Sequence, residues 1–182
     1  MSQLGQEYKE PPLAGDDLET LLGQLERQRR TFAWKTGGLD AAGLSAKVGA
    51  SSMTLGRLIK HLAMVEEVYF RCRLHGREPG PPWNTVDWEH DPEWVWHSAG
   101  NDTPEQLYGL WRDAVTQSRA LLEEALADGK GLDRPTALEF DGDTVTLRWL
   151  MANLVEEYAR HVGHADLIRE AVDGLVGEDP PD

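Results

Sequence analysis

The chain has 182 residues, of which 40% are hydrophobic, so it can form one well-developed core and is short for two. Its net charge of −14 argues against binding to a nucleic-acid backbone or to an anionic membrane surface, because both attract basic patches. The single cysteine, Cys72, excludes an intramolecular disulfide, and we find neither a secretory signal nor an apolar run of about 18 residues. We therefore expect one cytoplasmic domain over residues 1–182, with no nucleic-acid or membrane partner.

The first predicted helix spans residues 16–35. Residues 1–15 contain Pro11, Pro12 and Gly15 and few apolar side chains, so we expect a flexible N-terminal arm there. Asp16 is a suitable N-cap, and apolar residues then recur at helical spacing until Gly37 ends the pattern.

A second helix follows a connector over residues 39–52, which shows little periodicity. Thr54 is a plausible N-cap, and the apolar residues after it step by three and four as far as Cys72. His61 falls within this apolar stripe. Taken alone, it is most simply a core histidine whose ring is hydrogen-bonded to a carbonyl or a carboxylate.

The segment 74–101 has no helical period and is rich in proline and tryptophan. A connection of this length in a compact domain is usually functional or a docking surface. Its tryptophans either pin the loop against the helices or wall a pocket or a subunit contact. They are Trp83, Trp88, Trp94 and Trp96. The histidines of the segment lack ligand spacing, and we expect them on the surface; they are His75, His90 and His97.

A third helix and a small hairpin are predicted next. Thr103 followed by Pro104 is a strong helix start, and the helical period continues until Gly129. The turn sequence Asp141-Gly142-Asp143 lies between two short alternating runs, which predicts a hairpin. An isolated two-stranded ribbon is marginally stable, so it has to lean on the helices.

The fourth helix is predicted over residues 147–172 and closes at Gly174, a residue favoured just past a helix end. Residues 175–182 then read as an acidic, disordered tail. Four amphipathic helices with one elaborate connection predict an all-α fold, and a four-helix bundle in particular.

Polar groups interrupt the apolar stripe of the fourth helix. Glu157, His161 and His164 project from one face, because residues three and four apart are neighbours on a helix. We expect this face to be buried, so the three groups need partners or a cation. With His61, Glu157 and His161 can hold one divalent metal and leave positions open for water or substrate. Zinc is the first choice, and nickel, iron and manganese are alternatives.

The spacing alone leaves other interpretations open. Glu157 could pair with Arg148 or Arg160, and His161 could be a hydrogen-bonded core residue. His164 could be a fourth ligand, or it could hydrogen-bond a ligand from behind.

Four stretches carry a resemblance to a known family: residues 25–29 with Trp34 and Lys35, residues 54–62, residues 147–150 and residues 156–174. The run Glu-Glu-x-x-x-His-x-Gly-His-Ala-Asp in the last stretch is the most specific of them. In these stretches the chain resembles the DinB-like four-helix-bundle superfamily, in a branch related to the mycothiol-dependent maleylpyruvate isomerases.

The resemblance implies a metal site and a reaction class. Members of the superfamily hold their metal with a histidine of the second helix and a His-x-x-x-His pair of the last helix. The matching positions are His61, Glu157 and His161, with Glu157 in place of the first histidine of the pair, as in the maleylpyruvate isomerases. The relatives use a low-molecular-weight thiol, so mycothiol or a related thiol is the implied cosubstrate. His164 would be a proton acceptor or an orienting group.

The leading hypothesis is therefore a metal-dependent enzyme that transfers mycothiol to a small electrophile, or isomerises that electrophile, with the substrate entering beside the tryptophan-rich loop. A metal-dependent hydrolase would use the same three ligands to activate water. A non-catalytic, stress-related binding or dimerisation module would hold no metal. Exposed apolar helix faces would suit a homodimer in any of these cases.

Overall fold

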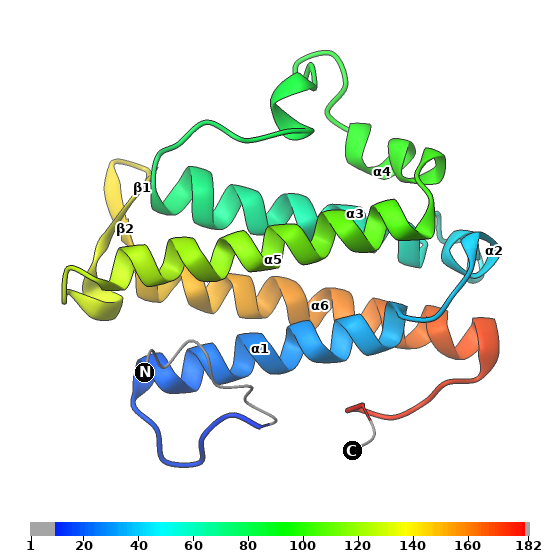
Figure 1. The fold of residues 1–182 in the computed structure, drawn as a ribbon, viewed down its shortest axis with the longest axis horizontal. Coiled ribbons are helices and arrows are strands. Elements are labelled where there is room, and N and C mark those ends of the chain that lie inside the picture. The colour runs from blue at the N-terminus through cyan, green and yellow to red at the C-terminus, as the bar shows by residue number, and fades with distance from the viewer. Residues whose placement is uncertain (1–9, 181–182) are drawn as a thin grey trace.

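The computed structural model describes residues 10–180, and these are mostly helical. Four long helical segments lie side by side (Figure 1). They are α1 (Asp17–Thr36), α3 (Leu55–Glu66) with its continuation η2 (Glu67–Leu74), α5 (Pro104–Leu126) and α6 (Leu147–Asp173). One two-stranded sheet is the only β-structure of the described residues. The all-α prediction therefore holds in outline.

Local sequence signals set the ends of the long helices. The Asp16 carboxylate accepts a hydrogen bond from the backbone of Glu19, and the Glu19 side chain reaches back to the Asp16 backbone. Thr103 and Gln106 form the same reciprocal cap at the start of α5. Gly174 ends α6 with φ 79°, a left-handed conformation that glycine adopts without steric penalty.

The second predicted helix changes its winding part-way along. It is an α-helix up to Glu66 and a π-helix over Glu67–Leu74, where sequence periodicity predicted one continuous α-helix. Glu66, Phe70 and Leu74 are all buried at steps of four residues. A step of four residues stays near one face both in an α-helix and in the wider π turn, so the core-facing pattern continues through η2.

The connecting segments are more ordered than the sequence indicated. The short helix α2 (Ala41–Ser45) lies in the expected connector, where Asp40 caps it; one turn is too short to produce a periodic pattern. The tryptophan-rich loop contains η3 (Trp83–Thr85), α4 (Trp94–Ser98) and η4 (Ala99–Asn101). This loop passes over α3 and α5 and then leads into the start of α5 (Figure 1).

One of the loop histidines was misplaced by the sequence prediction. The side chain of His75 is only 8% exposed, and its Nε2 lies 2.9 Å from the carbonyl oxygen of Leu121. The surface prediction is therefore wrong for His75, because the π-helix carries it against α5. His90 and His97 are exposed, as predicted.

The predicted hairpin is present. Strands β1 (Pro135–Phe140) and β2 (Asp143–Thr146) pair antiparallel around Asp141 and Gly142, both of which have positive φ. Val145 is buried, so the ribbon packs on the helices as its small size requires.

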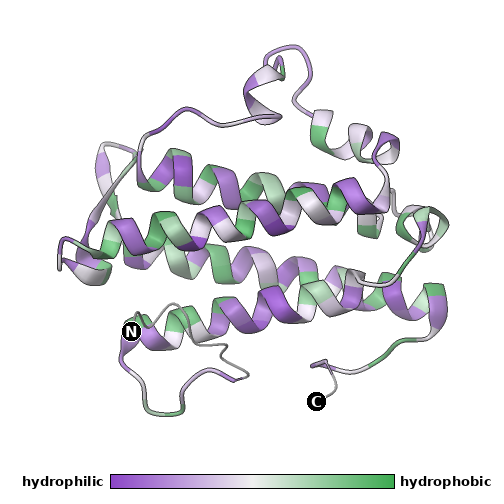
Figure 2. Cartoon of the chain, in the orientation of Figure 1, coloured by the Kyte–Doolittle hydropathy of each residue, from purple (hydrophilic) through white to green (hydrophobic). Residues whose placement is uncertain are grey.

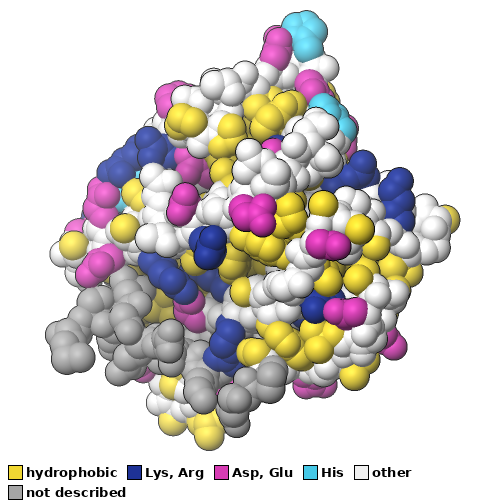
Figure 3. Space-filling view, turned by 45° about the vertical axis from the view of Figure 1, so that its right-hand side comes forward, with side chains coloured by type: hydrophobic (Ala, Val, Ile, Leu, Met, Phe, Trp, Pro, Cys, Tyr) yellow, Lys and Arg dark blue, Asp and Glu magenta, His cyan; other side chains and the backbone are white. Residues whose placement is uncertain are grey.

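The core lies between the long helices, along which hydrophobic and hydrophilic residues alternate with the helical turn (Figure 2). On the face drawn in Figure 3, hydrophobic side chains gather in the middle with charged side chains of both signs around them. Within residues 10–180, no helix combines the length and the apolar character needed to cross a membrane.

A charged network crosses this core. Arg29 of α1 donates hydrogen bonds to both carboxylate oxygens of Glu66 on α3, from Nε at 2.8 Å and from Nη2 at 2.6 Å. The hydroxyl of Tyr158 on α6 donates to the same carboxylate and accepts a hydrogen bond from Trp111 Nε1 of α5. All four long helices are thus connected in one buried network, in which α5 joins the Glu66 carboxylate through the hydroxyl of Tyr158.

The acidic tail was predicted to be disordered. In its described part, the Asp179 carboxylate accepts two hydrogen bonds from Arg27 of α1, at 2.8 and 3.0 Å. Of the predicted N-terminal arm, residues 1–9 lie outside the described residues, while Pro11 packs closely on Gly23.

Candidate metal centre

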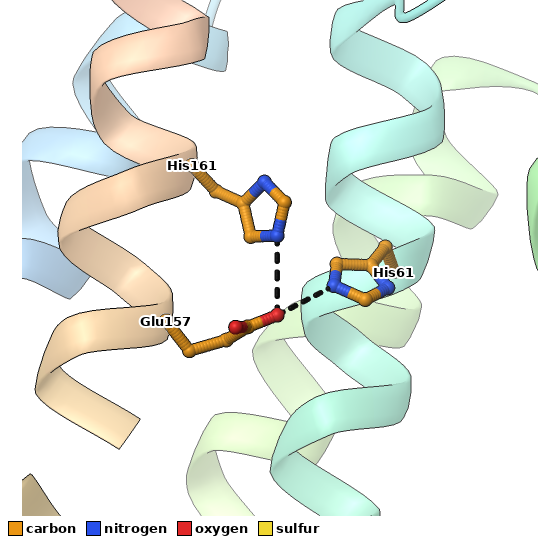
Figure 4. A group of neighbouring side chains, drawn as sticks. All are labelled: His61, Glu157 and His161. Carbon is orange, nitrogen blue, oxygen red and sulfur yellow. Dashed lines mark hydrogen bonds and ion pairs between the residues drawn. The ribbon is translucent and has the colours of Figure 1, made fainter. Parts of the chain in front are cut away.

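Helices α3 and α6 bring three of the predicted site residues together (Figure 4). Nε2 of His61 lies 2.9 Å from Oε1 of Glu157, and Nε2 of His161 lies 3.1 Å from the same oxygen. The three potential ligand atoms are all within 4.8 Å of one another. The sequence placed these residues on two helices, and the fold makes them neighbours.

The position of Glu157 on α6 differs by one residue from the predicted pattern. Tyr158 is fully buried and occupies the core position, whereas the Glu157 side chain is 29% exposed and lies at the edge of the core. His161, one turn further along α6, is buried and aligned with Glu157 at i, i+4. The carboxylate is therefore close enough to the surface to be reached by a small ligand.

The electrostatics of the cluster keep Glu157 ionised. Hydrogen bonds from His161 and His61 hold the pKa of this carboxyl well below its usual range, and they outweigh burial, which acts in the opposite direction. The alternative partners left open by the sequence pair elsewhere: Arg148 with Asp17, and Arg160 with Glu156.

Aromatic rings hold His61 in place. The indole of Trp96 on α4 stacks on the imidazole of His61 with ring centroids 4.5 Å apart and an interplanar angle of 20°. The ring of His161 meets His61 edge-on at 4.7 Å. Nδ1 of His61 is buried and has no hydrogen-bond partner among the described residues. Packing, rather than hydrogen bonding through Nδ1, orients this ring.

His164 lies behind His161 and outside the cluster of ligand atoms. Its Nδ1 is 3.3 Å from Nδ1 of His161, on the side of that ring opposite Nε2. Burial lowers the pKa of His164, and the neighbouring charges of His161 and Arg160 lower it further. A neutral His164 can accept the Nδ1 proton of His161 when that ring turns the lone pair of Nε2 toward a cation instead of donating to Glu157.

The three residues fit a divalent cation. Ligand atoms that lie about 2.0–2.2 Å from a tetrahedral zinc ion are roughly 3.4 Å apart, and the contacts of Glu157 to the two imidazoles are slightly shorter than this. Two imidazoles with one carboxylate suit zinc and also nickel, iron or manganese. Three protein ligands leave the coordination open, as in catalytic rather than structural sites.

A pocket of about 390 Å³ adjoins the cluster. Trp96 belongs to both, since it lines the pocket and stacks on His61. The sequence indicated that some tryptophan of the loop could wall a pocket, but nothing in it singled out Trp96. The other lining residues are Ser52, Met53, Arg57, Glu93 and His97.

Residues 20–174 match the family model of mycothiol-S-transferase. The chain belongs to the mycothiol-S-transferase family. This match includes all three residues of the cluster and confirms the resemblance to a mycothiol-related, DinB-like superfamily. No curated protein matches the chain.

Membership of the mycothiol-S-transferase family indicates a thiol-transferase type of enzyme in general terms. Mycothiol as the cosubstrate is consistent with this family. The match runs from the first turn of α1 to just past the end of α6, so it covers nearly the whole helical core. Among the described residues, His61, Glu157 and His161 form the group of three side chains whose ligand atoms lie close enough together to hold one metal ion.

Proposed function

We propose that this mycothiol-S-transferase family member is a divalent-metal-dependent enzyme that transfers mycothiol, or a related thiol, to a small electrophile. The observation that carries the proposal is the convergence of two imidazole Nε2 atoms, from α3 and α6, on one oxygen of an ionised Glu157. Such a donor set can hold one cation and leave positions for a substrate.

In this proposal His61, Glu157 and His161 hold the metal, with zinc as the first choice. A bound cation lowers the pKa of a coordinated thiol, so that the nucleophilic thiolate is available near neutral pH. The thiolate sulfur then forms a bond to the electrophilic carbon, the displaced electron pair leaves with the leaving group or moves into the adjacent bond, and the thiol proton passes to solvent.

The residues around the ligands have supporting roles. His164 contacts Nδ1 of His161, so we assign it to orienting that ring rather than to accepting the proton of the thiol. The stacked indole of Trp96 covers one face of His61 and keeps water from it. The carboxylate of Glu157 offsets one of the two positive charges of the ion.

We also propose that the four long helices form the four-helix bundle typical of DinB-like proteins. The family match over residues 20–174 and the side-by-side arrangement of α1, α3, α5 and α6 support this assignment.

The metal content of untagged protein tests the site. We expect about one divalent ion per chain in the wild type and a loss of most of it in His61→Ala and in His161→Ala. His90→Ala removes an exposed histidine and is the matched control. If both ligand variants keep the metal content of the wild type, the assignment of the site fails.

A second measurement tests the reaction. With 1-chloro-2,4-dinitrobenzene as the electrophile, we expect chloride release that depends on both metal and mycothiol. Metal-dependent hydrolysis of an ester without any thiol would instead favour the hydrolase interpretation, in which the same ligands activate water.

A further inference from the structure

Apart from Trp96, the residues that line the pocket beside His61 have no role in the proposed function. The pocket has a volume of about 390 Å³, within the range of roughly 300–1,000 Å³ that small-molecule sites occupy. Two of its lining residues lie near His61, a candidate ligand of the metal centre. Trp96 stacks on His61, and Arg57 precedes His61 by one turn on α3. A molecule bound in the pocket therefore has one end near the ligand cluster.

The lining combines an aromatic surface with hydrogen-bonding groups of both kinds. Trp96 and Met53 supply apolar surface. Arg57 supplies donors, and within residues 10–180 its side chain donates one hydrogen bond, from Nη1 to the carbonyl oxygen of Ser52. Glu93 supplies acceptors, and its side chain makes no capping hydrogen bond at the start of α4.

These groups favour a neutral ligand with many hydroxyl groups. The charges of Arg57 and Glu93 are opposite, so the pocket has no strong preference for an anion or a cation. A sugar or cyclitol ring has an apolar face of C–H groups, which can lie on an indole, and a rim of hydroxyl groups that both donate and accept. Arg57 and Glu93 match that rim, and Trp96 matches that face.

We propose that this pocket binds the sugar portion of the thiol cosubstrate, with Trp96 beneath a ring and with Arg57 and Glu93 bonded to its hydroxyl groups. The inference rests on the proposed function. Mycothiol carries its cysteine on a glucosamine joined to inositol, so it is neutral apart from the thiol and rich in hydroxyl groups. With the two rings in the pocket, the cysteine extends past Trp96 toward His61.

The rival occupant of the pocket is the electrophile. An electrophile held there would pack on the apolar surface of Trp96 and Met53. It would offer no hydrogen-bond partners to the side chains of Arg57 and Glu93. The sugar portion uses both, so the pocket composition favours the thiol.

A comparison of two thiols tests the inference on the metal-loaded, full-length protein. N-acetylcysteine has the reactive end of mycothiol without the rings. In the wild type we expect a clear preference for mycothiol in kcat/KM. We expect Trp96→Ala and Glu93→Ala each to reduce that preference by about tenfold, while Trp149→Ala, which removes an exposed tryptophan at the start of α6, leaves it unchanged.

Binding of glucosaminyl-inositol, which has no thiol, gives a readout independent of activity. We expect calorimetry to show binding to the wild type and to Trp149→Ala, and weaker binding to Glu93→Ala. Among residues 10–180, the hydrogen bond of the His61 side chain goes to Glu157 and not to Glu93, so the Glu93 variant still tests the pocket if Trp96→Ala loses metal.

The outcomes separate the two proposals. A wild type that uses neither thiol while binding glucosaminyl-inositol refutes the proposed function and supports the pocket assignment. Variants that keep both the preference for mycothiol and the binding of glucosaminyl-inositol overturn the pocket assignment. A rise in KM for the electrophile in Trp96→Ala and Glu93→Ala, with thiol preference intact, also overturns it.

Discussion

The charged network in the core gives a quantitative prediction about stability. Arg29 and Glu66 have side chains that are 3% and 0% exposed, and two hydrogen bonds join them. Burial lowers the pKa of Arg29, but the charges of Glu66 and Glu26 raise it by more, so the guanidinium stays charged. Glu66→Gln keeps the size of the side chain and removes the charge that balances Arg29.

The expected loss in the free energy of unfolding depends on which hydrogen-bond acceptors and charges remain around Arg29. A glutamine amide has a single oxygen that accepts hydrogen bonds, so one N–H of Arg29 loses its acceptor. Removing one partner of a buried ion pair costs about 3–5 kcal/mol. Glu26 remains 2.7 Å from Nη1 of Arg29 and offsets part of the loss. We therefore expect the lower end, about 3 kcal/mol, or roughly 6–12 °C in the unfolding midpoint of a chain of this size.

Urea unfolding followed by circular dichroism measures this cost. Glu156→Gln is the matched control, because Glu156 is 71% exposed and lies 3.5 Å from Arg160, a pair from which we expect at most about 0.5 kcal/mol. A double variant, Arg29→Met with Glu66→Met, should be more stable than Glu66→Gln, since it leaves no unpaired charge. The reasoning is refuted if Glu66→Gln costs no more than Glu156→Gln at an unchanged denaturant slope.

Three further predictions concern the metal site, the acid range and a helix end. His164→Ala should weaken zinc binding by about 10–100-fold without changing the stoichiometry at saturation, as measured by chelator competition; an unchanged affinity would contradict the orienting role. Burial raises the pKa of Glu26, but the hydrogen bonds and charges of Arg119 and Arg29 together lower it by more, so the pKa lies below its usual value. Its carboxylate therefore stabilises the fold above about pH 4.5 and loses this effect as the pH falls, so Glu26→Gln should flatten the decline in unfolding free energy between about pH 5 and 3. Gly174→Ala should cost about 1–2 kcal/mol in thermal unfolding because its φ is 79°, whereas Gly163→Ala, in open space within α6, should be neutral or stabilising; equal effects would show that the left-handed cap does not matter.

The sequence predicted those features that depend on short-range signals. Helix starts at Asp16 and Thr103 follow from capping side chains, and the end at Gly174 follows from backbone conformation, so each can be recognised within a few residues. The pairing of Glu157 with His161 likewise follows from a spacing of four. The grouping of these residues with His61 followed from ligand chemistry and was supported by the family resemblance, because no spacing relates residues on different helices.

Features that depend on tertiary packing were missed. The π-helical winding of Glu67–Leu74 leaves no mark in the sequence, because the buried residues there recur at steps of four, which also fit an α-helix. Trp96 is one of several tryptophans in a loop without periodicity, and only the path of the loop places it on His61. His75 has no local signal for burial, since its partner is a carbonyl group on α5.

Two carboxylates link α3 and α6, and their partners explain why one of them belongs to a metal site and the other does not. Glu66 is bonded to the guanidinium of Arg29 and the hydroxyl of Tyr158. The guanidinium cannot give up its proton in the physiological range, so these donors hold the carboxylate permanently. Glu157 is instead bonded to the imidazoles of His61 and His161, which can move the proton from Nε2 to Nδ1. His61, Glu157 and His161 can therefore either hydrogen-bond to one another or turn their lone pairs toward a cation. The buried carboxylate of Glu66 meanwhile holds together the helices that carry these three side chains.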